Sequence, residues 1–266
     1  MSFLIAVSKL DIAAKNIADK IIQNYNLNEI SPGLYRTGNV QLTYLENSSI
    51  FSSKLDKKFQ TDAIIFASKH QSEIQEPTLT VHVPGNLTDD ISYGGQPREL
   101  AWAWCQRMRN VLLKLNELKS TLENDYKISY EATHHGPTDF EIPVWFVEIG
   151  CNENFWRDEE AGTAVAEAIW ASLTNPLRGK PSIGFGGGHY ASKFTRLTLE
   201  GEFAFGHIIP KYALENLREG MITDAFKKTF EKCETAIIDW KGMKGGQRQK
   251  LLNILENMKI KEIIKV

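Results

Sequence analysis

The sequence predicts an α/β fold in which a mixed, mostly parallel β-sheet is flanked by helices. Short, almost wholly apolar stretches alternate along the chain with longer stretches whose apolar residues recur at helical spacing. Strands that are apolar throughout are typical of a sheet covered on both faces. The 266 residues, 42% of them hydrophobic, show no linker and no internal repeat. We therefore expect one compact domain over residues 1–266.

The first half of the chain opens as a βα unit. Residues 3–7 predict a buried strand, and the apolar residues between 11 and 22 repeat at helical spacing. Pro97 suits the first turn of a long helix, because no N–H needs a partner there, and an apolar stripe continues to Leu115. Two further apolar strands are expected between these helices, at residues 62–68 and 78–83.

The second half continues the alternation. Residues 126–132 alternate as a half-buried strand, and residues 143–149 form an apolar strand that carries Glu148 near its end. The acidic residues that follow Asp158 favour a helix start, because they complement the positive end of the helix dipole. The remaining elements are expected as a helix at 158–172, a strand at 181–185, and helices at 211–233 and 244–257.

The overall charge argues against a protein that grips nucleic acid over its whole surface, because the formal net charge is -2 and the pI is near 6.3. A local basic region remains at residues 241–266, where seven basic residues outnumber two acidic ones. This region predicts either a solvated helix and strand or a binding surface for an anionic partner. Its candidate contacts are Lys244, Arg248 and Lys250.

The three cysteines, Cys105, Cys151 and Cys233, lie far apart and match neither a disulfide framework nor a CxxC metal site. We expect reduced thiols in or near the core. No apolar run reaches the roughly 18 residues of a membrane span, and the first residues lack the basic start of a signal peptide. A cytoplasmic protein without membrane contact is therefore expected.

Histidines carry the candidate chemistry. Five of the six stand at predicted strand ends or turns, beside glycine, proline or polar residues. Because sites in α/β sheets gather beyond the carboxyl ends of the strands, we expect these five to converge in one cleft. Imidazole is a general acid or base near neutral pH and binds zinc through a neutral nitrogen. The sixth, His207, we assign to packing.

The spacing of these residues does not demand a metal, since HExxH is absent. His134 and His135 are adjacent, and successive side chains of an extended chain point to opposite faces. We therefore expect one of them to face the site and the other to support it. The alternative is a strand end that closes into a turn, with both imidazoles bonded to carbonyls. The candidate metal ligands are His70, His82, His134, His135, Glu148 and His189.

A triple glycine, Gly186, Gly187 and Gly188, precedes His189 and Tyr190. Glycine permits positive φ and close backbone approach, so these amides could receive a phosphate or a developing oxyanion. The alternative is a turn that only packs two strands tightly. Neither GxGxxG nor a P-loop lysine is present, so no nucleotide cofactor is expected.

Several of these segments together resemble the D-aminoacyl-tRNA deacylases of archaea and plants. They occur in one order and span nearly the whole chain. Ser192 and Lys193 stand where the family has proline and often arginine, so a rigid turn residue and a bidentate donor are replaced by a more flexible residue and a single ammonium. The matching segments are SKHQS at 68–72, PTLTVH at 77–82, GN at 85–86, EATHHGP at 131–137, EIG at 148–150, AG at 161–162 and GGGHYA at 186–191.

The resemblance implies hydrolysis of D-aminoacyl-tRNA to free tRNA and D-amino acid, zinc dependence, and a fold related to phosphorylases and peptidyl-tRNA hydrolases. In the resulting hypothesis the tRNA acceptor end lies on the basic segment, and zinc or one of His82, His134 and His189 activates a water that attacks the ester. A monomer is expected. The expected substrate contacts are Gly186, Gly187, Gly188, Tyr190, Lys193, Lys244, Arg248 and Lys250.

Three other interpretations remain open on sequence grounds. The same histidine cleft suits a peptidyl-tRNA hydrolase or another zinc hydrolase. The basic segment alone suits a non-catalytic RNA-binding module, and the βα opening with its glycine-rich loop is compatible with a small-molecule phosphorylase or nucleosidase. Substrate tests and replacement of His134 or His189 separate these interpretations.

Overall fold

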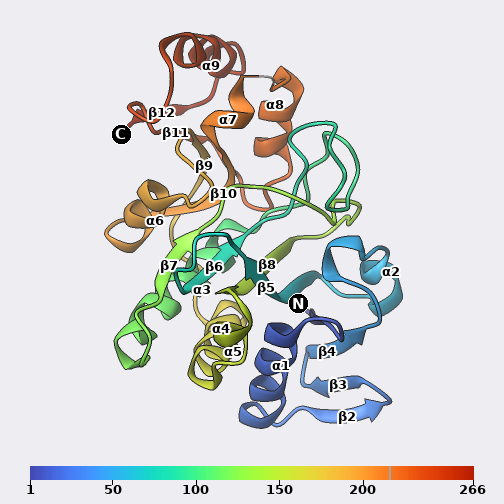
Figure 1. The fold of residues 1–266 in the computed structure, drawn as a ribbon. Coiled ribbons are helices and arrows are strands. Elements are labelled where there is room, and N and C mark those ends of the chain that lie inside the picture. Colours follow the sequence, from blue (N-terminus) through green and yellow to red (C-terminus); the bar gives the residue numbers. More distant parts are fainter. Residues whose placement is uncertain (216) are drawn as a thin grey trace.

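The strands form two sheets in the computed structural model, which describes residues 1–215 and 217–266 (Figure 1). The order in the large sheet is β2 (Asn28–Ser31), β3 (Leu34–Thr37), β4 (Val40–Leu45), β1 (Phe3–Ser8), β5 (Ala63–Gln71), β8 (Val144–Cys151), β6 (Thr78–His82) and β7 (Lys127–Tyr130). The order in the small sheet is β10 (Phe203–Ile209), β9 (Lys180–Phe185), β11 (Thr235–Ile238) and β12 (Glu262–Lys265).

The prediction of a mixed, mostly parallel sheet is confirmed. Every pairing in the small sheet is parallel, and so are the central pairings of β1 with β4 and β5 and of β5 with β8. The antiparallel pairings are β2 with β3, β3 with β4, and β6 with β8. Strand β6 therefore runs against the central strands, and this reversal brings its carboxyl end into the candidate site.

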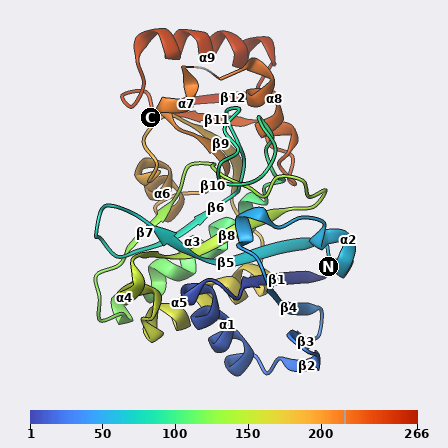
Figure 2. The same cartoon turned by 45° about the vertical axis from the view of Figure 1, so that its right-hand side comes forward.

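Helices cover the sheets, and two hydrophobic cores result. The large core lies between the large sheet and α1 (Ile12–Asn24), α3 (Cys105–Leu118) and α5 (Glu159–Thr174). The second core lies between the small sheet and α7 (Lys211–Leu214), α8 (Glu219–Lys227) and α9 (Gly245–Asn257) (Figure 2). The expectation of a single domain stays a prediction. The shorter elements are η1 (Ser49–Phe51), α2 (Leu55–Phe59), η2 (Lys119–Thr121), α4 (Glu153–Trp156) and α6 (Ser192–Leu199).

Local sequence explains the elements that were predicted correctly. All six residues of β1 are buried, as its apolar sequence predicts. Helix α1 begins after Asp11, whose Oδ1 accepts the N–H of Ala14 at 3.0 Å, and it buries an alanine and isoleucine face. The predicted strands and helices at 62–68, 78–83, 126–132, 143–149, 158–172, 181–185 and 244–257 are likewise confirmed to within a few residues.

The helix predicted to start at Pro97 begins instead at Cys105. The preceding segment is extended, because its backbone pairs with several distant parts of the chain. Leu100 bridges to Gly85, Trp102 to Pro143 and Ala103 to Thr229. Helix α3 then starts where the carboxylate of Glu231 accepts the N–H groups of Cys105 and Gln106, at 3.1 and 2.8 Å. Tertiary pairing therefore outweighs the local preference for helix.

The single helix predicted over 211–233 is also wrong. Helix α7 ends at Leu214 and α8 spans Glu219–Lys227. The chain leaves α8 because the N–H of Phe230 donates to the carbonyl of Ala103 at 2.8 Å. The sequence analysis also missed β10 and the hairpin of β2 and β3, whose β2 residues are all exposed and lack an apolar signal.

Two smaller predictions are confirmed. The three cysteines are free, with Cys105 and Cys151 buried and Cys233 partly buried. His207 is a fully buried packing residue whose Nδ1 lies 3.3 Å from Oγ1 of Thr133. Within the described part of the chain, no helix is both long and apolar enough to cross a membrane.

His207 is expected to make stability fall on acidification. Burial lowers the pKa of His207 to about 4, against about 6.5 in an unfolded chain. Between these pH values the unfolded chain binds a proton that the folded chain does not bind. The contribution of His207 to the free energy of unfolding is therefore complete above about pH 6.5 and is lost as the pH falls towards 4. From pH 7 to pH 5 the free energy of unfolding should drop by about 2 kcal/mol more in the wild type than in His207→Gln, measured by urea unfolding. Equal drops would contradict this.

Candidate active site

Three strands place site residues on one face of the large sheet. In the register of β5, β8 and β6, Ser68 lies level with Glu148, and Phe146 lies level with His82. Side chains alternate along a strand, so Glu148 and His82 lie on the same face, and so does His70, two residues beyond Ser68. The site therefore lies over a sheet face near the ends of β5 and β6.

His70 connects several parts of this site. Its Nδ1 lies 3.1 Å from Oε1 of Glu131 and 3.6 Å from Oε2 of Glu148, and its Nε2 lies 3.0 Å from the hydroxyl of Tyr190. Neighbouring Gly150 leaves room for the ring, because a Cβ at that position would stand 3.1 Å from Cδ2 of His70. His70 therefore links the strand face to the loop after the triple glycine.

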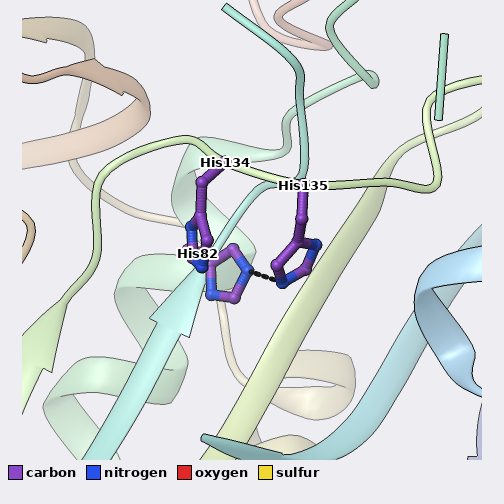
Figure 3. Close-up of side chains that lie close together, drawn as sticks. All are labelled: His82, His134 and His135. Atoms are coloured by element: carbon purple, nitrogen blue, oxygen red, sulfur yellow. Dashed lines mark hydrogen bonds between the residues drawn. The ribbon is translucent and has the colours of Figure 1, made fainter. Parts of the chain in front are cut away.

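The expectation that His134 and His135 point to opposite sides is wrong. His135 has a φ of 46°, in the left-handed region, so the alternation of an extended chain is broken. The two rings lie 4.3 Å apart, and both face His82, with ring centroids 4.4 and 4.9 Å from it (Figure 3). All three imidazoles therefore belong to one cluster.

Hydrogen bonds to the backbone fix two of these imidazoles. Nδ1 of His134 donates to the carbonyl of Ala132 at 2.8 Å, and Nδ1 of His135 donates to the carbonyl of Gly136 at 2.6 Å. Such bonds were expected if this segment were only a strand end that closes into a turn. They also leave the Nε2 atom of each ring with a free lone pair. The Nε2 of His135 faces Nε2 of His82 at 3.2 Å, which Figure 3 shows as a dashed line.

Glu131, which the sequence analysis did not single out, lies at the centre of the histidines. It is 1% exposed. Its Oε2 stands 3.3 Å from Nε2 of His189, 3.6 Å from Nε2 of His134 and 3.7 Å from Nδ1 of His82, while its Oε1 meets His70. Neither oxygen has a well-formed hydrogen bond to a described residue. Its sequence signals were its position at the end of an alternating strand and its place at the start of the EATHHGP segment, 131–137.

Burial and charge set the protonation of the cluster. Burial lowers the pKa of His134 to about 4 and lowers the pKa values of His82 and His135 well below the usual histidine range. These three imidazoles are therefore neutral at pH 7. Burial alone would raise the pKa of Glu131, but its contact with His189 and the charge of His70 hold that pKa well below its ordinary value.

His70 and Glu148 form the second electrostatic pair. Burial disfavours the charge of His70, but its bond to Glu148 and the charges of Glu131 and Glu148 raise its pKa above the usual value. The pKa of Glu148 is also raised, chiefly by burial and further by the charge of Glu131, against the effect of His70. The centre of the site therefore holds one firmly ionised carboxylate, Glu131.

Groups of ligand atoms close enough to share a metal ion occur here. One is His82, His134 and His135, and another is His70, Glu131 and His189; within each group the ligand atoms lie within 4.8 Å of one another. Two ligands of one tetrahedral zinc are separated by about 3.4 Å. The 3.2 Å between the Nε2 atoms of His82 and His135 matches this, and the lone pair of His134 faces a carboxylate oxygen at 3.6 Å. Nε2 of His134 and the carboxylate oxygen are both hydrogen-bond acceptors, and a cation between or beside them would satisfy both.

A cavity of about 800 Å³ opens over this cluster. Its lining includes His70, His134, His135, Glu148 and His189, together with Asp11, Lys69 and Tyr93. His82 is 2% exposed and lies behind the neighbouring imidazoles. The structure thus brings all six candidate metal ligands together, with Glu131 among them.

The predicted substrate contacts lie in two places. Gly186 and Gly187 have φ values of 105° and 75°, and the N–H of Gly186 donates to Ile209 at 2.9 Å. Lys193 Nζ lies 2.7 Å from Oδ1 of Asp239 and 3.3 Å from the carbonyl of Val266. Tyr190 bonds to His70, as described above, and Gly188 is the third residue of the loop. Lys244, Arg248 and Lys250 belong to the start of α9.

Comparison with known proteins supports the resemblance seen in the motifs. A family model described as D-aminoacyl-tRNA deacylase matches residues 57–263. The chain is 40% identical over 261 residues to the D-aminoacyl-tRNA deacylase of Pyrococcus horikoshii, covering 92% of this chain and 93% of that one. It is 36% identical over 270 residues to the D-aminoacyl-tRNA deacylase of Methanocaldococcus jannaschii, with 97% of each chain covered.

A solved structure agrees over the whole fold. The crystal structure of a conserved protein of unknown function superimposes with a TM-score of 0.92 and 31% sequence identity, covering 99% of this chain and 95% of that chain. The family match spans the sheet face, the histidine cluster and the small sheet. This chain belongs to the D-aminoacyl-tRNA deacylase family.

Proposed function

We propose that this chain hydrolyses the ester bond of D-aminoacyl-tRNA and releases free tRNA and the D-amino acid. Family membership supports the reaction. The single observation that carries it in the structure is the convergence of four imidazoles on one buried carboxylate, with a fifth beside them, beneath a large cavity. This arrangement supplies metal ligands and a proton acceptor in one place, which is what ester hydrolysis by water requires.

We further propose that the metal is zinc and that His82, His134 and His135 hold it through their Nε2 atoms. Three neutral imidazoles with room for a water are typical of catalytic zinc sites. Bonds from Nδ1 to backbone carbonyls fix the tautomers of His134 and His135, as in other histidine metal sites. When bound, zinc would lower the pKa of a water and polarise the ester carbonyl.

His189 is the proton acceptor in this proposal. Its side chain is 35% exposed and lines the cavity, and its Nε2 lies 3.3 Å from Glu131. Donation of a hydrogen bond from this Nε2 to the carboxylate during the reaction would leave the lone pair on Nδ1, the tautomer that can take a proton from the attacking water. Glu131 thereby orients His189 and stabilises the imidazolium, and it faces Nδ1 of His82 from the opposite side.

The aminoacyl group is assigned to the large cavity because hydrogen-bond acceptors line it. A D-aminoacyl ester carries a free ammonium, and the carboxyl oxygens of Asp11 and Glu148 belong to the lining of the same cavity as the histidines. Lys69 lies at 4.6 Å over the ring of Trp156, which holds its ammonium at the side of this cavity. With the ammonium held at a fixed place, D- and L-substrates would present opposite faces of the ester carbonyl to the attacking water. Discrimination would then depend on which face lies towards that water.

The tRNA acceptor end is assigned to the basic segment at residues 241–266. Arg248 lies over the ring of Trp240 at 4.9 Å and Lys265 over the same ring at 4.5 Å, which groups two cations on one aromatic side chain. Lysine and arginine at such a surface contact phosphates and position RNA without reading its sequence. We also propose a monomer that acts in the cytoplasm.

The test compares three esters with purified protein: D-Tyr-tRNA, L-Tyr-tRNA and N-acetyl-L-Tyr-tRNA. The D-ester is expected to be hydrolysed at least about 100-fold faster than the L-ester, a difference that about 2.7 kcal/mol of transition-state binding provides. Preference for the N-blocked ester would indicate a peptidyl-tRNA hydrolase. Binding without turnover of any ester would indicate an RNA-binding module, and turnover of small nucleosides alone a nucleosidase.

A further inference from the structure

A second, smaller cavity of about 260 Å³ lies beside the histidine cluster. It shares Tyr93, His134 and His135 with the large cavity, so the two cavities meet at these three residues. We call it the tyrosine pocket, because Tyr93 and Tyr212 both line it. The residues that define it are Gly85, Asn86, Leu87, Thr88, Asp90, Tyr93, Thr133, His134, His135, Tyr212 and Ala213.

Both tyrosines expose large aromatic surfaces at this pocket. Tyr93 is 68% exposed and Tyr212 is 59% exposed, which is unusual for rings of this size. The backbone of Tyr93 is nevertheless anchored, because its carbonyl accepts the N–H of Gly136 at 3.0 Å, next to His135. Exposed aromatic rings at a cavity are the usual platform for an unpaired nucleobase.

The pocket also offers a hydrogen-bond acceptor. Asn86 is 7% exposed, and its Nδ2 donates to the carbonyls of Gly94 and Gln96 at 2.7 and 3.0 Å. Both amide hydrogens are therefore used, and no donor from residues 1–215 or 217–266 reaches Oδ1 within hydrogen-bond distance. The one carboxylate of the lining, Asp90, is engaged by Ser92. A carboxamide oxygen matches the exocyclic amine of adenine.

The position of the pocket fits the path of an RNA end. Tyr212 belongs to α7, and Nε2 of Gln247 at the start of α9 donates to the carbonyl of Lys211 at 3.0 Å. Lys244 also reaches Glu215, at 3.8 Å. The tyrosine pocket therefore lies between the basic segment and the histidines. A strand that leaves the basic segment would pass Tyr212 before its ester reached His134.

We propose that the tyrosine pocket binds the 3′-terminal adenine base of tRNA, stacked on Tyr93 and Tyr212 with its exocyclic amine facing Oδ1 of Asn86. This inference rests on the proposed function and adds where the substrate's terminal nucleotide sits. The ribose ester then lies over His134 and His135, where the two cavities meet, and the amino acid enters the large cavity with its charged lining. A binding site on each side of the ester fixes the carbonyl at the histidines.

The first experiment measures base stacking without catalysis. An uncharged acceptor minihelix carries 2-aminopurine riboside at its 3′ end, and its fluorescence is recorded as protein is added. Quenching is expected with the wild type, with Tyr93→Phe and with Tyr212→Phe, because phenylalanine keeps the ring. Tyr93→Ala and Tyr212→Ala should remove most of the quenching. Equal quenching in the alanine and phenylalanine variants would overturn the proposal.

The second experiment measures turnover of D-Tyr-tRNA by the same proteins. Each alanine variant should raise KM by about 10- to 100-fold and leave kcat within a few-fold, because stacking places the substrate without touching the reacting atoms. A D-aminoacyl minihelix ending in purine riboside, which lacks the exocyclic amine, should lose about fivefold in kcat/KM with the wild type. Unchanged KM and an unaffected purine substrate would overturn the pocket assignment while the deacylase reaction stands. Quenching without any hydrolysis by the wild type would instead reject the proposed function and keep the base site.

Discussion

Glu131→Gln is expected to lower kcat/KM for D-aminoacyl-tRNA by about three orders of magnitude, with the fold retained. The glutamine keeps the size of the side chain and can fill the same buried position. It carries no charge, and its amide group can present N–H to His189 or His82 where the carboxylate offers only acceptors. His189 would then lose its orienting partner and its preferred tautomer. The measurement is single-turnover hydrolysis of D-Tyr-tRNA, with circular dichroism to verify folding.

Glu148→Gln is the matched control for this prediction. Both glutamates are buried in the same site, but among the described imidazoles only His70 lies within ion-pair distance of Glu148, at 3.6 Å. Burial also raises the pKa of Glu148 towards the neutral form, which glutamine mimics. Its loss of activity should stay within about tenfold. Equal losses in the two variants, or near-normal activity in Glu131→Gln, would show that Glu131 is not the orienting carboxylate.

Much of the fold was predictable because its strands and helices are decided locally. The apolar run of β1 and the helical spacing of α1 leave few alternatives for residues 3–24. The errors fall in segments whose conformation depends on backbone pairing with residues far away in the sequence. The segment before Cys105 is extended because it bridges to Gly85, Pro143 and Thr229, none of which is near it in sequence. No window of the sequence contains those partners.

The candidate site likewise contains residues that the local sequence indicates and residues whose role depends on tertiary contacts. Five histidines in polar turns predicted a pool of candidate residues, and the structure brings these residues together around one cavity. Glu131 was missed since its importance depends on how β7 pairs with β6 and how the loop of His189 crosses over it, where the N–H of Ala132 donates to the His189 carbonyl at 2.8 Å. The positive φ of His135 likewise depends on its surroundings, so alternation predicted the wrong side.

Removal of metal is expected to abolish hydrolysis and also to lower thermal stability. Without the ion, the Nε2 lone pair of His134 faces a carboxylate oxygen of Glu131, and the three proposed ligands His82, His134 and His135 lose the cation that would hold them together. A ligand that binds only the folded state adds about 2.7 kcal/mol at 100 times its Kd, so the thermal midpoint should fall by several degrees after chelation. Activity below about 1% is expected, with recovery of activity and midpoint on zinc addition but not on magnesium addition.

His135→Ala distinguishes the metal from a histidine base in this experiment. His135 supplies one of the three proposed ligands but does not lie within ion-pair distance of Glu131 in the described contacts, unlike His134 and His189. Loss of one ligand should lower the bound zinc and the activity together, by about 10- to 100-fold or more. His189→Ala should abolish turnover and keep the zinc. Full activity after chelator treatment would assign the reaction to His189 and Glu131 alone. The three-histidine cluster would then have a structural role, in which His134 and His135, bonded to backbone carbonyls, close the turn after β7.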